Sequence, residues 1–265
     1  MCIEARAIHS MLAITTLLAI PLSHGCSLMI PKHCKQDWNR GYTLVLPGID
    51  CRHIMHRRLA RGIEDGGVAG TIEIHDWTTG IPPLMLLHLR NAFEHDKQAE
   101  VIAQKIVAYQ TSYPGRPVHL IGHSGGAGIA LMALDRLPME NQVNSLVLLH
   151  PAVSPAYDLR KALQQSRAGV WNFSSAINDS ALLVLGTTLF GTVDGYHRPA
   201  AGALGFNLPE GLSYADRWNY HNRLHEVPYR LEFLSNTNLG GHYGAMTYSF
   251  SKTHIAPILV EAGKR

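Results

Sequence analysis

The stretch from Val118 to Gly128, VHLIGHSGGAG, constrains the fold more than any other part of the sequence. Strand-type residues lead directly into Gly-x-Ser-x-Gly, and small residues then open a helix-type segment. Glycines beside Ser124 leave the space that a sharp turn needs, because they carry no side chain to clash. With 24 glycines the bare pattern arises easily by chance, so its context carries the interpretation. That context predicts a strand, a strained turn at Ser124 and a helix.

Strand-type and helix-type segments alternate on both sides of this turn. Strands are expected at residues 42–46, 71–77, 145–150 and 170–175, and helices near 55–63, 99–106, 129–137 and 158–168. The run at 145–150 is continuously apolar, as in a strand that is buried on both faces of a parallel sheet. The pattern predicts a three-layer α/β/α fold with a mostly parallel central sheet.

The alternation stops between Ala181 and Trp218, where the chain is rich in glycine, proline and apolar residues and poor in charge. This composition is too apolar for a solvated linker, so residues 181–218 are expected to form a cap-like or substrate-lining segment. A last strand is predicted at 231–234 and a closing helix at 253–264. Residues 41–265 are therefore expected to form one domain.

The N-terminus has the pattern of an export signal. Met11 to Leu22 is a short uncharged apolar run, too short to span a membrane as a helix, and it is followed by Cys26. Residues 1–26 are predicted to be a signal peptide or lipoprotein signal, and residues 27–40 a linker. The protein is thus expected to be periplasmic, membrane-anchored through a lipidated Cys26, or simply secreted.

Composition and short motifs exclude several other classes. The net charge is +3 with 16% charged residues and no long basic run, so nucleic-acid binding is not expected. Neither a nucleotide-binding glycine motif nor HExxH occurs, so the sequence predicts no cofactor and no metal. Cys34 and Cys51 remain in the mature domain, and whether they pair is open.

A serine hydroxyl needs a general base to become a nucleophile at neutral pH. Among 16 histidines, His242 is distinguished by its place in the late glycine-rich stretch LGGHYG, which can bring an imidazole close to a serine. We therefore predict Ser124 as nucleophile and His242 as base.

The strand, the GHSGG turn, the following helix and the late histidine together resemble the α/β-hydrolase superfamily, from about Tyr42 onward. The resemblance implies an acid between Ser124 and His242 in chain order, just after the strand at 170–175. Asp179 is chosen; Asp194 would fit if residues 181–186 formed the strand instead, and Asp158 is a third alternative.

The tetrahedral intermediate of acyl transfer needs backbone N–H donors that point at its oxyanion. Gly125, directly after Ser124, is expected to supply one of them. The resemblance places the other after an early strand, and the loop LPGID makes Ile49 the candidate.

These residues predict an exported serine hydrolase that acts on carboxylic esters, with a small ester or acyl compound as substrate. An acyltransferase or peptidase would use the same three side chains and stays open. A non-catalytic binding protein of the same fold is the alternative from another class.

Overall fold

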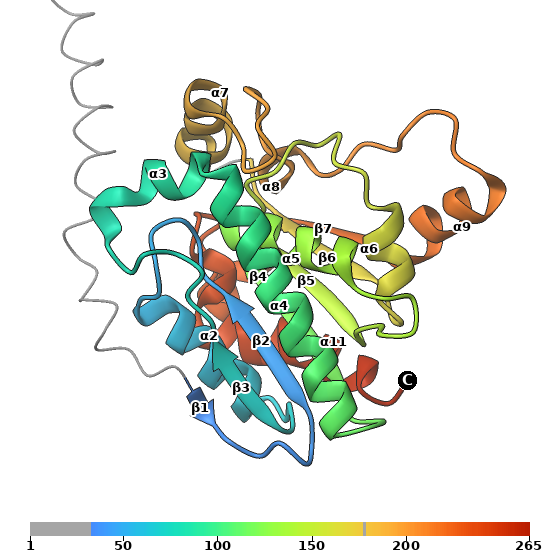
Figure 1. The fold of residues 1–265 in the computed structure, drawn as a ribbon. Coiled ribbons are helices and arrows are strands. Elements are labelled where there is room, and N and C mark those ends of the chain that lie inside the picture. Colours follow the sequence, from blue (N-terminus) through green and yellow to red (C-terminus); the bar gives the residue numbers. More distant parts are fainter. Residues whose placement is uncertain (1–32, 177–178) are drawn as a thin grey trace, which may run out of the picture.

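A computed structural model describes residues 33–176 and 179–265 of the chain (Figure 1). The expected export segment, residues 1–26 with Cys26, lies outside the described residues.

One sheet organises the described chain, in the strand order β1-β3-β2-β4-β5-β6-β7. Its strands are β1 (His33–Lys35), β2 (Tyr42–Leu46), β3 (Thr71–Ile74), β4 (Val118–His123), β5 (Ser145–Leu149), β6 (Val170–Ser174) and β7 (Leu224–Pro228). β1 is antiparallel to β3, and every other pairing is parallel. β2, β4 and β5 are fully buried because both of their faces are covered.

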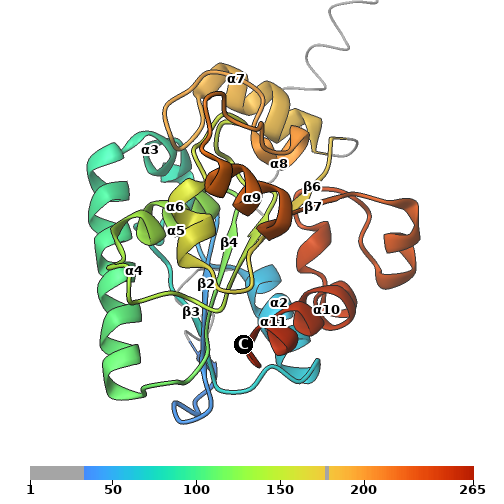
Figure 2. The same cartoon turned by 90° about the vertical axis from the view of Figure 1, so that its right-hand side faces the viewer.

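Helices cover both faces of the sheet, as the edge-on view of Figure 2 shows. α4 (Ala92–Ser112), α5 (Gly125–Arg136) and α6 (Arg160–Gln165) lie on one side; α2 (Ile54–Asp65), α10 (Tyr248–Phe250) and α11 (Ala256–Ala262) lie on the other. Neighbouring residues of β4 point to opposite faces of the sheet. Leu120 packs in the apolar core on the α4 and α5 side, and Ile121 packs in the core on the α2 and α11 side. The predicted three-layer α/β/α fold with a mostly parallel sheet is confirmed.

The predicted last strand at 231–234 is wrong. Those residues begin the 3₁₀ helix η5 (Leu231–Asn236), and the last strand is β7, earlier in the chain. The sequence of β7, LHEVP, lacks a strand pattern because this edge strand is only partly buried and places Glu226 beside Asn172 of β6. At the other edge, β1 falls within the segment expected to be a linker.

The predicted closing helix is divided in two. The π-type turn η7 (Ser251–Ile255) leads into α11 with helical backbone angles at Ile255, and Pro257 stands in the first turn of α11.

Residues 180–223 form short helices: the π-type η4 (Ser180–Gly186), α7 (Thr187–Phe190), α8 (Ala201–Leu204) and α9 (Tyr214–Arg223). The alternative of a strand at 181–186 is therefore wrong. Backbone hydrogen bonds from Val193 to Ala152 and from Gly202 to Pro151 fasten this segment over the carboxyl end of β5. Figure 1 shows α7 and α8 at that end of the sheet, near α3 (Met85–Arg90). In the described ranges we find no helix that is both long and apolar enough to cross a membrane.

Candidate active site

Ser124 lies in a strained turn between β4 and α5. Its φ of 52° and ψ of −119° are unusual for a residue with a side chain, and its N–H donates to the Leu149 carbonyl at 2.9 Å. The neighbouring glycines are sterically required: a Cβ atom on Gly122 would lie 2.8 Å from the Ala127 nitrogen. The predicted sequence of strand, sharp turn and helix is present.

His242 lies in the loop between η5 and η6 (Gly244–Met246), and its Nδ1 is 2.7 Å from Asp179 Oδ2. Asp179 follows β6 and is the residue before η4; its side chain is 1% exposed, against 10% for His242. The rings of His242 and His123 are 4.7 Å apart, which brings the histidine loop to the turn at Ser124. The structure thus pairs Asp179 with His242 and brings the His242 ring next to His123, the residue before Ser124.

The two alternative acids have other partners. Asp194 accepts a hydrogen bond from the backbone N–H of Ser154 at 2.9 Å. Asp158 forms an exposed ion pair with Arg160 at 2.5 Å. Neither contact involves His242.

The charges of Asp179 and His242 stabilise one another. Burial would raise the pKa of the Asp179 carboxyl, but His242 and His150 hold it well below its usual range. Burial would lower the pKa of His242, while Asp179, with a smaller contribution from Asp50, raises it above its ordinary value. The carboxylate thus favours the imidazolium that forms when His242 accepts a proton.

His150 was missed by the sequence analysis. It follows β5 directly, is 2% exposed and has a positive φ of 49°. Its Nδ1 lies 3.3 Å from Asp179 Oδ2, so two imidazoles flank one carboxylate. The signal available in the sequence was its position after an apolar strand, because the carboxyl ends of parallel strands form the edge where sites are built.

The loop after β2 lies against the serine turn. A Cβ atom on Gly48 would be 3.1 Å from Ser124 Cβ, and one on Gly125 would be 3.5 Å from the Ile49 nitrogen. Among the described residues, neither the Gly125 nor the Ile49 N–H has a backbone or side-chain acceptor. Both N–H groups are therefore available as donors beside Ser124.

Two side chains that the sequence analysis also missed hold this loop. The Trp77 indole donates to the Pro47 carbonyl at 2.7 Å, and His88 Nδ1 donates to the Ile49 carbonyl at 2.7 Å. These bonds fix the Pro47–Gly48 and Ile49–Asp50 peptide planes, and the Gly48 carbonyl of the peptide between them accepts the Cys51 N–H at 3.3 Å. The Ile49 N–H, which belongs to that middle peptide, is therefore oriented before any ligand arrives.

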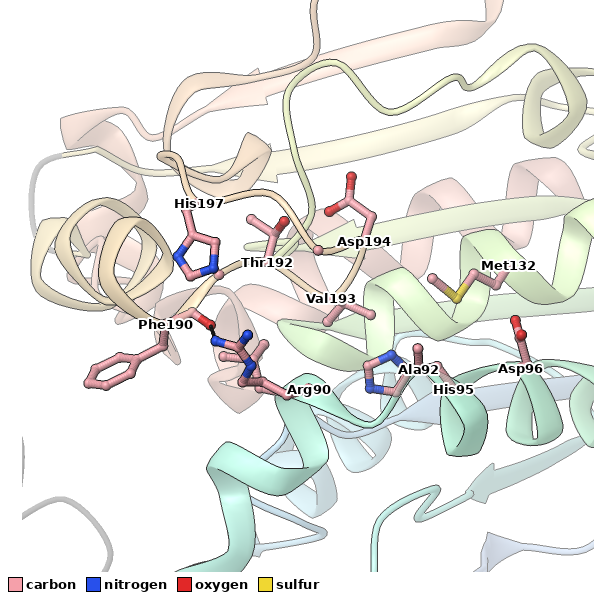
Figure 3. Close-up of a pocket in the computed structure, with 13 residues that line it drawn as sticks. Arg90, Ala92, His95, Asp96, Met132, Phe190, Thr192, Val193, Asp194 and His197 are labelled. Atoms are coloured by element: carbon pink, nitrogen blue, oxygen red, sulfur yellow. Dashed lines mark hydrogen bonds between the residues drawn. The ribbon is translucent and has the colours of Figure 1, made fainter.

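A cavity of about 260 Å³ lies farther along α5 (Figure 3). Met132 of α5, Phe190 and Val193 contribute apolar surface, while Arg90 and His197 contribute polar groups. Arg90 also donates to the Phe190 carbonyl at 3.2 Å, which joins α3 to α7. The cavity borders the segment expected to line a substrate.

Cys51 is free and buried, and burial raises the pKa of its thiol to about 11, so it is unreactive at neutral pH. His53 and His56, three residues apart in the sequence, pack against one another with their ring centroids 4.2 Å apart. Within residues 33–176 and 179–265, no group of three or more ligand-type side chains is arranged to hold a metal ion.

Comparisons with known proteins found several similar solved structures. Three similar solved structures are a member of the alpha/beta hydrolase superfamily from Xanthomonas campestris pv. campestris, a cutinase-like protein from Cryptococcus sp. and the thioesterase domain SrfTE. Their identities to this chain are 18%, 13% and 15%, with TM-scores of 0.42, 0.41 and 0.39. The matches cover 80%, 86% and 84% of this chain and 97%, 98% and 91% of the other chains.

No curated protein sequence matches the chain. The sequence pattern of the alpha/beta hydrolase fold family, however, matches residues 74–232, more than half of the chain. The chain belongs to the alpha/beta hydrolase family.

Proposed function

We propose that the protein is an exported serine hydrolase that cleaves carboxylic esters with Ser124, His242 and Asp179. The observation that carries the proposal is the 2.7 Å contact between His242 Nδ1 and a buried Asp179 beside a serine in a strained strand-to-helix turn. Burying a carboxylate is costly, and a histidine in an ordinary surface loop would not need a buried carboxylate as its partner.

The proposed reaction follows from this arrangement. Because Asp179 accepts the Nδ1 proton, Nε2 of His242 is free to take the proton of Ser124 as its Oγ attacks the ester carbonyl. His242 then gives that proton to the departing alcohol, and an acyl-enzyme forms on Ser124. Water activated by His242 releases the acid and restores the serine. The N–H groups of Gly125 and Ile49 stabilise the oxyanion in both steps.

The acyl side of the substrate is proposed to be apolar. Leu87 of α3 is 63% exposed and Leu189 of α7 is 59% exposed, on two helices joined by the Arg90 bond. Exposed apolar side chains that gather on one surface mark a site that binds apolar ligands, and we infer that Leu87 and Leu189 belong to such a surface. This supports an acyl or aryl ester over a sugar or a charged peptide.

An acyltransferase or a peptidase would differ only in the acceptor or the leaving group. Product analysis distinguishes them: hydrolysis yields the free acid at a rate that added alcohols or amines leave unchanged. A non-catalytic binding protein would release no acid at all.

The test uses a fluorophosphonate probe and short p-nitrophenyl esters. We expect the parent protein to be labelled and to hydrolyse the esters, and Ser124→Ala to lose both properties while its circular dichroism is retained. Ser145→Ala, which alters another fully buried serine on the adjacent strand β5, is the matched control and should keep both. A parent protein that is inert to probe and ester would contradict the proposal.

Export is tested separately. If residues 1–26 are a processed signal, intact-mass measurement of the protein exported by a bacterial host should find a chain that begins at or near Cys26. An exported chain that still carries Met1 would show that this part of the proposal is wrong.

A further inference from the structure

The turn formed by His242 and Tyr243 is held by two side chains from other parts of the chain. His123 Nε2 lies 3.0 Å from the His242 carbonyl oxygen. The Tyr243 hydroxyl donates to Asp50 Oδ2 at 2.6 Å. Both contacts are in addition to the Asp179 bond to the His242 ring.

His123 is the residue before Ser124, and it is completely buried. Burial lowers the pKa of its imidazole well below the usual value, so the ring is neutral at neutral pH. A carbonyl only accepts hydrogen bonds, and therefore Nε2 of His123 carries the proton and donates it to His242. The backbone of His242 is thereby joined, through the His123 side chain, to the residue that precedes Ser124.

Asp50 follows Ile49, one of the candidate oxyanion donors. Its Oδ2 also lies 2.9 Å from Nε2 of His53, which is 1% exposed. Nδ1 of His53 accepts the Met55 N–H at the start of α2, so its Nε2 carries a proton toward Asp50. Burial would raise the pKa of the Asp50 carboxyl, but His53 holds it well below its usual range. Asp50 is thus an anchored carboxylate.

We propose that His123 and Asp50 are positioning residues that fix the His242 ring relative to Ser124 and the Ile49 donor. This inference rests on the proposed function of the same site. The His123 bond fastens the loop that carries His242 to the residue before Ser124. The Asp50 bond fastens the same loop, through Tyr243, to the loop after β2 that carries Ile49. A base that is displaced by about 1 Å from its productive position loses on the order of 10²-fold in rate, so these bonds matter for turnover even though neither side chain touches substrate.

Asp50 also contributes negative charge near His242. The titratable groups that face His242 are Asp179, Asp50, His123, His150 and Tyr243. Of these, Asp179 and Asp50 carry negative charge and favour the imidazolium of His242. Replacing Asp50 by Asn keeps an acceptor for Tyr243 but removes the charge, so the pKa of His242 should fall. The acidic limb of the kcat/KM profile should then move to lower pH, because His242 becomes neutral, and active, at lower pH.

The experiment compares Tyr243→Phe, His123→Phe and Asp50→Asn with two matched controls. His119→Phe changes another buried histidine of β4, whose partner is Ser145 Oγ at 2.8 Å. Tyr157→Phe removes another hydroxyl that donates to a carboxylate, Asp135, at 2.8 Å. Fluorophosphonate titration counts active sites, so that rates refer only to folded, reactive protein.

We expect kcat per titrated site to fall about 10-fold to 100-fold in His123→Phe and about 3-fold to 10-fold in Tyr243→Phe, with KM changed less than 3-fold. Both controls should stay within about 2-fold of the parent. Asp50→Asn should shift the acidic limb downward, while Tyr243→Phe should leave that limb within about 0.2 pH units of the parent. Tyr243→Phe retains its ring, so it keeps the test valid should His123→Phe fail to fold.

Unchanged kcat per site in Tyr243→Phe, together with an unshifted limb in Asp50→Asn, would overturn the positioning role. If the parent itself shows no Ser124-dependent labelling or hydrolysis, the proposed function fails instead. The two failures are therefore distinguishable.

Discussion

The candidate site combines two regions that are built in different ways. Residues 42–149 alternate strands and helices, and they supply Ser124 and the N–H groups of Gly125 and Ile49. Residues 179–247 consist mostly of short helices and loops, and they supply Asp179 and His242. In the proposed mechanism the regular region thus contributes the nucleophile and the backbone dipoles, while the irregular region contributes the acid and the base.

Each region is held by the kind of interaction that its backbone allows. In the regular region, β2, β4 and β5 are joined by parallel ladders between two apolar cores. In the irregular region, side chains bond to the backbone: the Gly240 carbonyl accepts a hydrogen bond at 2.6 Å from Ser175 Oγ, directly after β6, and Asn238 Oδ1 accepts the Gly240 N–H at 2.9 Å. A loop without a ladder keeps its shape only through such contacts. Single side chains should therefore matter more there.

The largest expected effect comes from the irregular region. Asp179→Asn should lower kcat/KM for short esters by about 10³-fold to 10⁴-fold, because the amide no longer fixes the tautomer of His242 or stabilises its charge. Steady-state kinetics on protein of verified secondary structure would measure this change.

Asp194→Asn is the matched control, since it changes an aspartate of the same region that accepts the Ser154 N–H. It should stay within about 3-fold of the parent, because the amide oxygen can keep that bond. Near-parental activity in Asp179→Asn would show that the irregular region does not supply the acid.

An intermediate effect is expected for a glycine in the regular region. A Cβ atom on Gly126 would collide with the carbonyl oxygens of Leu46, at the end of β2, and of Pro47, in the loop that follows, and these backbone atoms cannot rotate away as a side chain could. Gly126→Ala should lower the free energy of unfolding by about 1–3 kcal/mol, as overpacking does. It should also lower kcat by about 10-fold to 100-fold, because the loop that carries Ile49 is displaced. Urea titration and kinetics on the same samples measure both.

Gly186→Ala is the control from the irregular region. Gly186 has helical angles, φ −59° and ψ −50°, and its added Cβ would meet only the Ala181 carbonyl, at 3.3 Å. Alanine favours a helix over glycine by about 1 kcal/mol, which offsets this contact, so stability and kcat should change little. Equal losses of stability and kcat in Gly126→Ala and Gly186→Ala would show that the regular and irregular regions do not differ in their tolerance of an added side chain.

The same distinction explains how far the sequence could be interpreted. In the regular region the apolar signal is strong, because a strand such as β5, buried on both faces, is a continuous apolar run. The strand-turn-helix around Ser124 could therefore be predicted from local residues. Asp179 and His242 were chosen from chain order and glycine flanks, and the structure places them in contact. Their roles in catalysis remain proposals.

Other features depend on contacts that no local pattern encodes. Edge strand β7 has a half-exposed, partly charged sequence, so LEFL in a 3₁₀ helix looked more like a strand than β7 itself. His123 and His150 were two among 16 histidines until the fold brought them to His242 and Asp179. Long-range side-chain pairing of this kind is visible only once the sheet order is known.

The smallest expected effect concerns the exposed apolar side chains that flank the site. Leu87→Ser and Leu189→Ser alter residues that are 63% and 59% exposed, so neither should change the free energy of unfolding by more than about 0.5 kcal/mol. If α3 and α7 contact the acyl chain, each variant should lower kcat/KM for octanoate esters about 3-fold to 10-fold, the value of one or two buried methylenes. Acetate esters, whose acyl group is too short to reach these helices, should be unaffected.

Met139→Ser is the matched control, because Met139 is 61% exposed. It lies in the loop before the amino end of β5, whereas Ser124 lies at the carboxyl end of the neighbouring strand β4. It should leave the ratio of octanoate to acetate activity unchanged. A parental ratio in Leu87→Ser and Leu189→Ser as well would mean that the irregular region supplies the acid and the base but no surface for the acyl chain. The substrate preference would then have to come from residues of the regular region, with Trp77 and Ile49 beside Gly125 as the nearest apolar groups.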